Sequence, residues 1–377
     1  MSEGETALPL TGTTVVDLSR MLPGAVLARM LTDLGARVIK VEDPAGGDPL
    51  RYLPPFVDGV AAGFCAFFRG CSSLAIDLRD PAGAEVVRRL ARHADVVVES
   101  FRPGALAAWG LGAERLQAAN PALVMCSLTG FGDHANWQRR AGHDLNFVAL
   151  TGLLSLLPGD GVPRIQLADV AAGMLACSAI LAALLRRQRT GNGALIQQPL
   201  VAAPLPFVLL PWADHAAGGK SVVDTVLAGR CPAYRLYRCA DGLQVAIGAL
   251  EPKFWSELVH AVGLSHLAGA GLDTGELGDA AAHELAAVLA GETRGHWLAL
   301  LEDRGLPVSA VNDLAVAQDL PWFDEGGFLE KTPAPGGAFL RTPGPFCPSV
   351  GATPDRPAPR LGEHNAAILA ELGGDDV

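Results

Sequence analysis

Hydrophobic residues in the first third of the chain follow two alternating patterns. Short runs rich in β-branched residues, the pattern of buried strands, occur at 12–19, 37–43, 74–78, 95–100 and 123–132. Segments with apolar residues at helical spacing lie among them, at 25–36 and 85–93. Strands that alternate with helices predict Rossmann-like βαβ units and a mostly parallel sheet, so we expect an α/β fold. A GxGxxG turn follows none of these strands, so they give no local support for dinucleotide binding.

The middle of the chain has a different composition. Positions 191–225 are rich in Ala, Pro and Gly and predict an irregular connection between two domains. After it, 234–248 has the pattern of two strands joined by an Asp-Gly turn. Helical patterns follow at 253–263 and 283–305. These elements predict a second, smaller α+β domain.

The length of 377 residues also favours more than one domain. The C-terminal part is rich in Pro and Gly at 333–359 and ends in a short helical pattern at 363–372. We therefore expect a large α/β domain at 1–205 completed by 335–377, a linker at 206–225, a small α+β domain at 226–320 and a second linker at 321–334.

One uncharged run, 170–185, is long enough that a membrane-spanning helix must be considered. A spanning helix needs about 20 apolar residues, and this run is bounded by Asp169 and by a basic group that ends at Gly191. We interpret it as a core helix that is N-capped by Asp169 and ends at Gly191. The N-terminal residues have no basic and apolar regions of a signal peptide, and we expect no membrane association.

Composition and charge narrow the classes of function. A net charge of −11 argues against general nucleic-acid binding, although it permits a local basic pocket. The cysteines form no CxxC pair, which is typical of reduced thiols in a cytoplasmic protein and not of a disulfide framework or zinc site. We expect no metal site. The scattered cysteines are Cys65, Cys71, Cys126, Cys177, Cys231, Cys239 and Cys347.

Three segments contain side chains suited to acid–base chemistry. His143 and Asp144 stand in GHDLN, Asp169 stands in QLAD, and Glu251 stands in ALEP, after a strand and before a helix. Each has a structural interpretation, because His-Asp pairs are common in folds and carboxylates are favoured at helix starts. An imidazole and a partly desolvated carboxylate are also suited to proton transfer near neutral pH.

The order of these segments resembles that of the α-methylacyl-CoA racemases, in the family III (CaiB/BaiF-type) CoA-transferase superfamily. Motifs that carry the resemblance are LPLTGTTVVDLSRMLPG, LTDLGARVIKVEDP, VVVESFRPGALAAWGLG, LTGFG, GHDLN, QLAD, ALEP and LGEHNAAILAELG. They extend over nearly the whole chain. The resemblance implies an isomerase that inverts the α-carbon of a 2-methylacyl-CoA, or a related acyl thioester, through an enolate.

The resemblance also implies roles for the candidate residues. His143 and Asp169 act as the acid–base pair on opposite faces of the α-carbon, and Glu251 fixes the histidine tautomer. The backbone N–H of Asp144 stabilises the enolate, whereas the Asp144 side chain is structural. The transferase branch uses the position of Asp169 as a nucleophile and typically lacks the histidine. A family III CoA-transferase is therefore the alternative function.

The residues expected to hold CoA depart in part from those of relatives. Lys40, Arg69 and Arg102 occupy positions that contact the nucleotide in the family, but Cys71 and Ser72 stand where a basic pair is usual. Fewer cations predict weak binding of free acyl-CoA. A non-CoA or carrier-tethered acyl substrate is therefore a further alternative.

The resemblance also implies an assembly and a cofactor requirement. Superfamily members form interlocked homodimers, and the Pro/Gly-rich segments at 191–225 and 333–359 are suitable crossing passages. We expect a homodimer with an acyl thioester substrate and no nucleic-acid partner. Coenzyme A is expected only as part of the substrate, with no separate cofactor.

Overall fold

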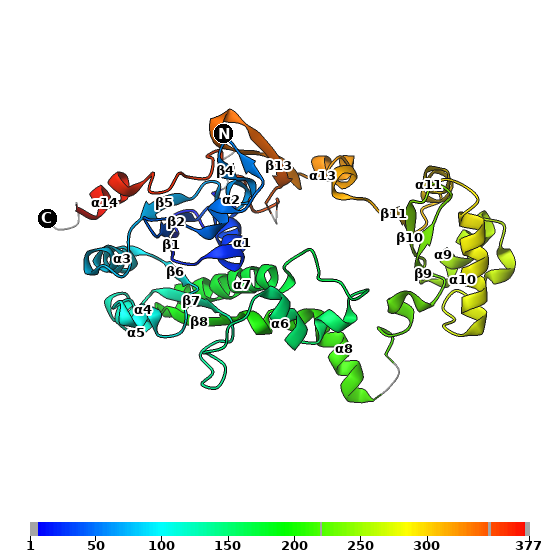
Figure 1. Cartoon of the computed structure of the whole chain (residues 1–377), viewed down its shortest axis with the longest axis horizontal. Coiled ribbons are helices and arrows are strands. Elements are labelled where there is room, and N and C mark those ends of the chain that lie inside the picture. Colours follow the sequence, from blue (N-terminus) through cyan, green and yellow to red (C-terminus); the bar gives the residue numbers. More distant parts are fainter. Residues whose placement is uncertain (1–6, 219–220, 346–347, 374–377) are drawn as a thin grey trace. The chain divides into compact units, whose positions relative to one another are not determined.

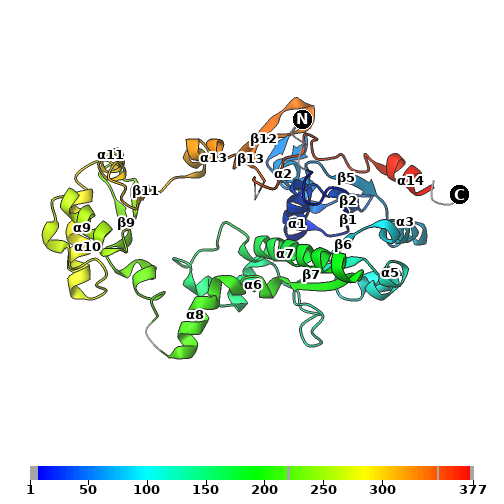
Figure 2. The same cartoon turned by 180° about the vertical axis from the view of Figure 1, so that it is seen from behind.

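A computed structural model describes residues 7–218, 221–345 and 348–373. Contacts within the chain divide it into two units, which are described separately. The first unit contains residues 1–207 and 321–377, and the second contains 208–320. Figures 1 and 2 show the first unit built around a twisted sheet flanked by helices.

The first unit contains a six-stranded parallel sheet with strand order β5-β2-β1-β6-β7-β8. Its strands are β1 (Thr14–Asp17), β2 (Arg37–Glu42), β5 (Ser72–Ala75), β6 (Val96–Glu99), β7 (Val124–Thr129) and β8 (Ala194–Pro199). The predicted α/β fold with a mostly parallel sheet is confirmed. The order reverses between β1 and β6, which places a crevice at the carboxyl ends of those strands.

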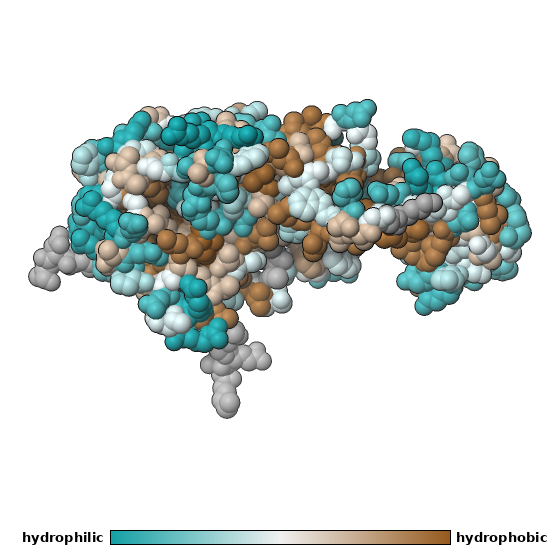
Figure 3. Space-filling model, turned by 90° about the horizontal axis from the view of Figure 1, so that it is seen from below, coloured by the Kyte–Doolittle hydropathy of each residue, from teal (hydrophilic) through white to brown (hydrophobic). Residues whose placement is uncertain are grey.

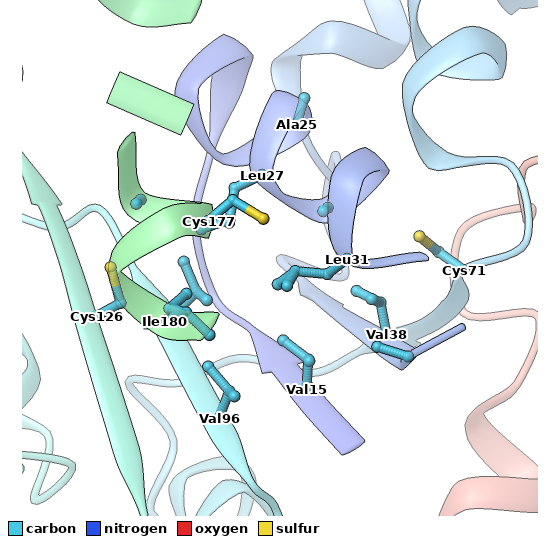
Figure 4. Packing of buried hydrophobic residues seen from close by; sticks show 14 of the residues in the cluster. Val15, Ala25, Leu27, Leu31, Val38, Cys71, Val96, Cys126, Cys177 and Ile180 are labelled. Atoms are coloured by element: carbon cyan, nitrogen blue, oxygen red, sulfur yellow. The ribbon is translucent and has the colours of Figure 1, made fainter. Parts of the chain in front are cut away.

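Helices cover both faces of this sheet. Helices α1 (Met21–Asp33) and α7 (Leu167–Thr190) lie side by side on one face (Figures 1 and 2). Figure 4 shows Leu31 of α1 and Ile180 of α7 near Val15 of the sheet, within one buried cluster. The opposite face packs against α3 (Pro81–His93), α4 (Ala105–Ala108), α5 (Ala113–Ala119) and α14 (Asn365–Gly373).

Alternation along the strands explains how both faces are filled. In β1, Val15 belongs to the cluster under α1 and α7, whereas Val16 belongs to the cluster under α3. Successive strand side chains point to opposite faces, so a strand buried on both sides is continuously apolar. The remaining elements of this unit are α2 (Ala62–Phe68), α6 (Asp144–Leu150), α13 (Pro321–Glu325), β3 (Phe56–Val57), β4 (Val60–Ala61), β12 (Leu329–Pro333) and β13 (Phe339–Pro343).

The second unit has its own core. Strands β9 (Tyr234–Arg238), β10 (Gln244–Gly248) and β11 (Val308–Ala310) form an antiparallel sheet. Buried residues of this sheet and of its helices form one hydrophobic cluster. The predicted strand pair at 234–248 and the helices after it are confirmed. The helices are α9 (Pro252–Ala261), α10 (Glu276–Leu289), α11 (Arg294–Glu302) and α12 (Leu314–Ala317).

Two segments predicted as linkers are more regular than expected. The segment 191–225 contains β8 and an apolar helix, α8 (Leu205–Ala217). Pro206 lies in the first turn of α8, where its missing N–H costs no hydrogen bond, and Pro211 lies inside the helix. The segment 321–334 contains α13 and β12. The prediction of an irregular connection was therefore wrong. It treated the prolines as helix breakers, but they do not prevent α8 from forming.

Helix α7 is the long core helix predicted around 170–185. It ends at Gly191, which adopts a left-handed conformation with φ of 73°, as predicted. Within the described part of the chain, α7 alone has the length and apolar character to cross a membrane, and half of its most apolar stretch is buried in the protein. Its packing on α1 and the sheet is that of a core helix.

Six cysteines in the described ranges are free and buried. Their dispersal over both units agrees with the prediction of reduced thiols and no disulfide framework. Cys347 lies outside the described residues. Within those residues, no group of three or more His, Cys, Asp or Glu side chains could hold a metal ion.

Candidate active site

Two helix N-termini place the candidate acid–base residues in the first unit. His143 is the extended residue immediately before α6, and its N–H donates to Asn146 Oδ1 at 3.0 Å. This local bond fixes the backbone that carries the imidazole. Asp169 lies in the first turn of α7, and α6 packs against α7. The fold therefore brings together two segments that are separate in the sequence.

The Asp144 side chain joins the two helices. Its Oδ1 accepts hydrogen bonds from the backbone N–H groups of Ala168 at 2.7 Å and Asp169 at 3.0 Å. These N–H groups lie in the first turn of α7, where the helix offers no carbonyl oxygen to accept their hydrogen bonds. The predicted structural role of this side chain agrees with these contacts. The prediction that Asp169 is the N-cap was wrong, because Gln166 occupies that position and Asp144 supplies the capping oxygen.

Capping by Asp144 leaves the Asp169 carboxylate available for chemistry. Asp169 is half-buried, and burial raises its pKa to about 6, with a further increase from the negative charge of Asp144 and an opposing effect of His143. A carboxylate with a pKa near 6 is still mostly ionised at neutral pH. It is a stronger base than an ordinary aspartate, as proton abstraction requires.

A cavity of about 230 Å³ lies at the carboxyl edge of the sheet beside His143. Two connections line it, one after β6 and one that joins β7 to α6. The lining includes two exposed arginines, Arg102 and Arg140, the latter stacked on the Trp137 ring with 3.8 Å between Cζ and the ring centroid. A polar, basic cavity at the carboxyl ends of parallel strands has the character of a site for an anionic ligand.

The loop just before His143 packs so closely on the Phe147 ring that position 142 has no room for a side chain. A Cβ on Gly142 would lie 2.9 Å from the Phe147 ring, closer than carbon atoms normally approach. Phe147 is buried, and its ring meets Phe131 edge-on with centroids 5.4 Å apart. Glycine before the catalytic candidate thus allows the loop to lie directly on this aromatic pair.

The structure places Lys40 away from any ligand surface. Its side chain is 1% exposed, and its Nζ lies 3.3 Å from Asp17 Oδ2 and 3.2 Å from Asp48 Oδ2. Burial alone would lower the pKa of Lys40, but the charges of Asp17 and Asp48 outweigh it and raise that pKa. A nucleotide contact for Lys40 does not fit this placement, because its charge is already balanced inside the core.

Arg69 is also an internal residue. Its guanidinium is fully buried and lies 2.9 Å from Asp33 and 2.7 Å from Glu330 of β12. The predicted phosphate contact does not fit this arrangement either. These ion pairs instead link the C-terminal strands to the start of the first unit. Of the three residues predicted to hold CoA, Arg102 alone is exposed and lines the cavity beside His143.

Cys71 and Ser72 do not face a ligand surface where a cation could meet a phosphate. Cys71 is 2% exposed and Ser72 is 7% exposed, so both positions lie inside the first unit. Cys71 lies beside Thr32, with 3.5 Å between Sγ and Oγ1. A cation at either position would be buried against the core instead of facing a phosphate. Their lack of charge therefore does not predict weak binding of acyl-CoA.

Glu251 belongs to the second unit. It lies between β10 and α9 as predicted, precedes Pro252, and is exposed. Its carboxylate makes no capping hydrogen bond to α9. The side chain is therefore free of local contacts that would define it as a helix cap. Its role as partner of His143 remains a prediction.

Sequence reasoning missed the neutral polar residues of the cavity, Ser100, Thr129 and Gln138. Thr129 ends β7 and Gln138 lies in the loop before α6, and both line the cavity beside His143. Arg140 was not assigned a role from the sequence either. The position of Thr129 at the carboxyl end of a parallel strand was the available signal, because such residues face the ligand crevice in this class of sheet.

Comparison with known proteins identifies the family. A model of CoA-transferase family III matches residues 10–365, and the chain belongs to that family. Human alpha-methylacyl-CoA racemase is 33% identical over 394 residues, covering 97% of this chain and 94% of that protein. Mouse succinyl-CoA:glutarate CoA-transferase is 32% identical over 384 residues, covering 98% of this chain and 88% of that protein.

Solved structures agree with this assignment. A CAIB/BAIF family protein from Brucella suis is 33% identical, with a TM-score of 0.83 and coverage of 97% of this chain and 100% of that chain. The family resemblance predicted from the motifs is confirmed. The chain belongs to a family of enzymes that act on CoA thioesters as racemases or transferases.

Proposed function

We propose that the protein is an acyl-thioester racemase or epimerase that inverts an α-carbon by proton transfer. The observation that carries this proposal is the pairing of His143 with Asp169. The Asp169 carboxylate does not cap a helix, is half-buried and has a pKa raised to about 6. Asp169 therefore changes its protonation state near neutral pH, and an imidazole is the side chain most often used as a general acid or base. One can therefore accept a proton while the other donates one, as a racemase requires.

The proposed mechanism uses the two groups in succession. For one enantiomer, one group removes the α-proton, and the thioester becomes an enolate. The other group then delivers a proton to the opposite face, and the roles reverse for the other enantiomer. The N–H of Asp144, in the first turn of α6, has no partner within its helix and is the proposed donor to the enolate oxygen.

The cavity residues favour a CoA thioester as substrate. Arg102 and Arg140 supply positive charge beside His143 in a chain whose net charge is −11. An arginine fork suits a diphosphate or phosphate group. The proposal requires no metal or separate cofactor, since coenzyme A enters as part of the substrate. A carrier-tethered acyl group is a narrower alternative, because it would bring fewer phosphates to these arginines.

A CoA-transferase is the second candidate function. A transferase at 32% identity covers as much of this chain as a racemase does, and Asp169 is suited to either chemistry. In that reaction the Asp169 carboxylate would attack the thioester carbonyl and expel the CoA thiolate, which gives a mixed anhydride. The thiolate would then attack the Asp169 carbonyl of this anhydride, release the donor carboxylate and leave CoA bound to Asp169 as a thioester. His143 favours the racemase, because the transferase route gives an imidazole no necessary proton to move.

An assay with one substrate separates these functions. We expect a single enantiomer of a 2-methylacyl-CoA to become a racemic mixture without any carboxylic acid acceptor. We expect no CoA adduct on the Asp169 peptide by mass spectrometry. Inversion that requires an added carboxylic acid, or CoA trapped on Asp169, would assign the protein to the transferase branch.

We also propose a homodimer, supported by exposed apolar surface. Hydrophobic residues are visible on the face shown in Figure 3. Helix α8 exposes Leu205, Phe207, Leu209, Leu210 and Trp212. Exposed apolar groups on one helix are typical of a surface covered by another chain. Light scattering should give twice the 39.1 kDa chain mass, and a 39.1 kDa species at micromolar concentration would contradict the dimer.

A further inference from the structure

Arg140, which lines the cavity beside His143, is held by an aromatic ring and by no carboxylate. It is exposed, and its Cζ lies 3.8 Å from the centroid of the Trp137 ring. Within the described part of the chain, the Arg140 guanidinium makes no hydrogen bond and no ion pair. Its N–H donors therefore remain available to a ligand in the cavity.

Another stacked arginine shows how the protein uses such a group internally. Arg51 lies over the Phe64 ring at the same distance of 3.8 Å. Its Nε and Nη2 donate to the two carboxylate oxygens of Glu42 at 2.7 Å, and its Nη1 donates to Pro359 O at 3.0 Å. The donors of Arg51 are thus used inside the protein, whereas those of Arg140 are not. Stacking without a carboxylate partner suits an arginine that binds an anion from outside.

Backbone hydrogen bonds bring Trp137 and Arg140 together. The N–H of Arg140 donates to Trp137 O at 2.8 Å, which closes a turn between these two residues. The N–H of Trp137 donates to His134 O, also at 2.8 Å. The ends of such a turn lie close together, so the Arg140 side chain folds back over the Trp137 ring.

The Trp137 ring is itself anchored in the first unit. It packs on the Phe131 ring with centroids 5.6 Å apart, and Phe131 meets the Phe147 ring edge-on at 5.4 Å. Phe131 is 8% exposed and Phe147 is 1% exposed. A chain of aromatic contacts thus extends from a buried residue of α6 to the guanidinium of Arg140.

Trp137 does not line the cavity beside His143. It lines a separate apolar cavity of about 340 Å³, whose other lining residues are Phe131, His134, Leu150 and Val201. A ligand beside His143 is therefore influenced by Trp137 through Arg140, which contacts the Trp137 ring and lines the cavity of that ligand.

We propose that Trp137 is a positioning residue that holds Arg140 in the orientation in which it binds the anionic end of the substrate. The stack covers a face of the guanidinium and leaves its in-plane N–H donors free for a phosphate or diphosphate. An arginine loses rotamer freedom when it binds a ligand, and a stack that already restricts the side chain lowers that cost. This inference rests on the proposed function, in which Arg140 meets the charged end of an acyl-CoA.

Calorimetric titration with isobutyryl-CoA measures the effect, because inversion at its α-carbon produces no new compound. We expect Trp137→Leu to bind this ligand about 3- to 10-fold more weakly than wild type, since the leucine offers no aromatic face to the guanidinium. Trp137→Phe keeps an aromatic face and should bind within about twofold of wild type. Full affinity in Trp137→Leu would overturn the assignment.

A double variant tests whether Trp137 acts through Arg140. Arg140→Gln should bind isobutyryl-CoA about 10- to 100-fold more weakly, because a charge-assisted contact is lost. In the Arg140→Gln background, Trp137→Leu should change the affinity by less than about twofold, since the group that it positions is gone. Losses that multiply in the double variant would show that Trp137 acts independently of Arg140, and would contradict the proposal.

Leu150→Ala is the matched control for the apolar cavity. Leu150 lines that cavity with Trp137 and is 53% exposed, so its replacement enlarges the cavity without touching the stack. We expect this variant to bind isobutyryl-CoA as wild type does. Equal losses in Leu150→Ala and Trp137→Leu would mean that the apolar cavity itself holds part of the ligand, which would overturn the positioning role.

Kinetics separate this inference from the proposed function. In solvent-deuterium exchange into isobutyryl-CoA, Trp137→Leu should raise KM about 3- to 10-fold and leave kcat within about twofold, because Arg140 binds the ground state and the transition state alike. A wild type that binds isobutyryl-CoA without exchange would refute the proposed function, while the affinities of the variants still decide the role of Trp137. A wild type that does not bind isobutyryl-CoA would overturn both.

Discussion

Replacement of Asp169 by Asn is expected to lower the rate of α-carbon inversion by about 10²- to 10⁴-fold, the usual contribution of a positioned acid or base. The amide keeps the shape of the side chain but cannot accept the proton. His143→Ala should have an effect of similar size. Asp160→Asn is the control for charge, since Asp160 is exposed and lies outside the cavity beside His143. Rates within about twofold of wild type in either test variant would contradict the assignment.

The Asp169→Asn variant should nevertheless be more stable than wild type at pH 8. Burial, with a smaller effect of Asp144, raises the pKa of Asp169 from 3.8 to about 6, so folding disfavours its ionised form. The contribution of this group to stability is present below pH 3.8 and is lost as pH rises through about 6.

We expect the gain of Asp169→Asn at pH 8 to be about 1–2 kcal/mol, allowing for solvent screening of a half-buried group. The gain should vanish at pH 4. Thermal melts at both pH values measure it, and they separate loss of catalysis from loss of fold. A variant less stable than wild type at pH 8 would show that the carboxylate has a structural role.

Replacement of Lys40 by Met is expected to lower the free energy of unfolding by about 3–5 kcal/mol, because it leaves two buried carboxylates without their cation. Asp17 and Asp48 are each about as buried as Lys40 itself. Burial already raises the pKa of Asp17 despite the attraction of Lys40. Urea denaturation followed by circular dichroism measures the loss.

A matched control lies on the same strand. Arg37 of β2 pairs with Glu371 at 2.7 Å, but both side chains are about half exposed. Arg37→Met should cost at most about 1 kcal/mol, since exposed ion pairs contribute little. A Lys40→Met variant with full stability and a higher KM for an acyl-CoA would contradict this prediction. That result would show that Lys40 contacts the nucleotide.

The fold of the first unit was predictable because its strands carry a strong local pattern. A run such as that around Val15 and Val16 is apolar at successive positions, which is the pattern of a strand covered on both faces. The connection at 191–225 was not predictable in the same way. Proline interrupts a helix by removing one donor, and α8 forms despite Pro211 because propensity alone does not decide a helix.

The candidate site was only partly predictable for a similar reason. GHD and LAD motifs indicated His143 and Asp169, but the bond from Asp144 to the start of α7 depends on tertiary packing. Lys40 and Arg69 were assigned by position to a ligand, yet burial sets their role, and a motif does not reveal burial. Arg140 was assigned no role, because its stacking on Trp137 can be recognised only after both side chains are placed.

In the proposed reaction, His143 and Asp169 exchange the α-proton of an acyl thioester from opposite faces. The most direct measurement is deuterium incorporation at the α-carbon in D₂O, started separately from each enantiomer of a 2-methylacyl-CoA. We predict incorporation from both enantiomers in wild type, and from only one, a different one in each case, in His143→Ala and Asp169→Asn. No incorporation in wild type, or equal incorporation from both enantiomers in either variant, would contradict the account.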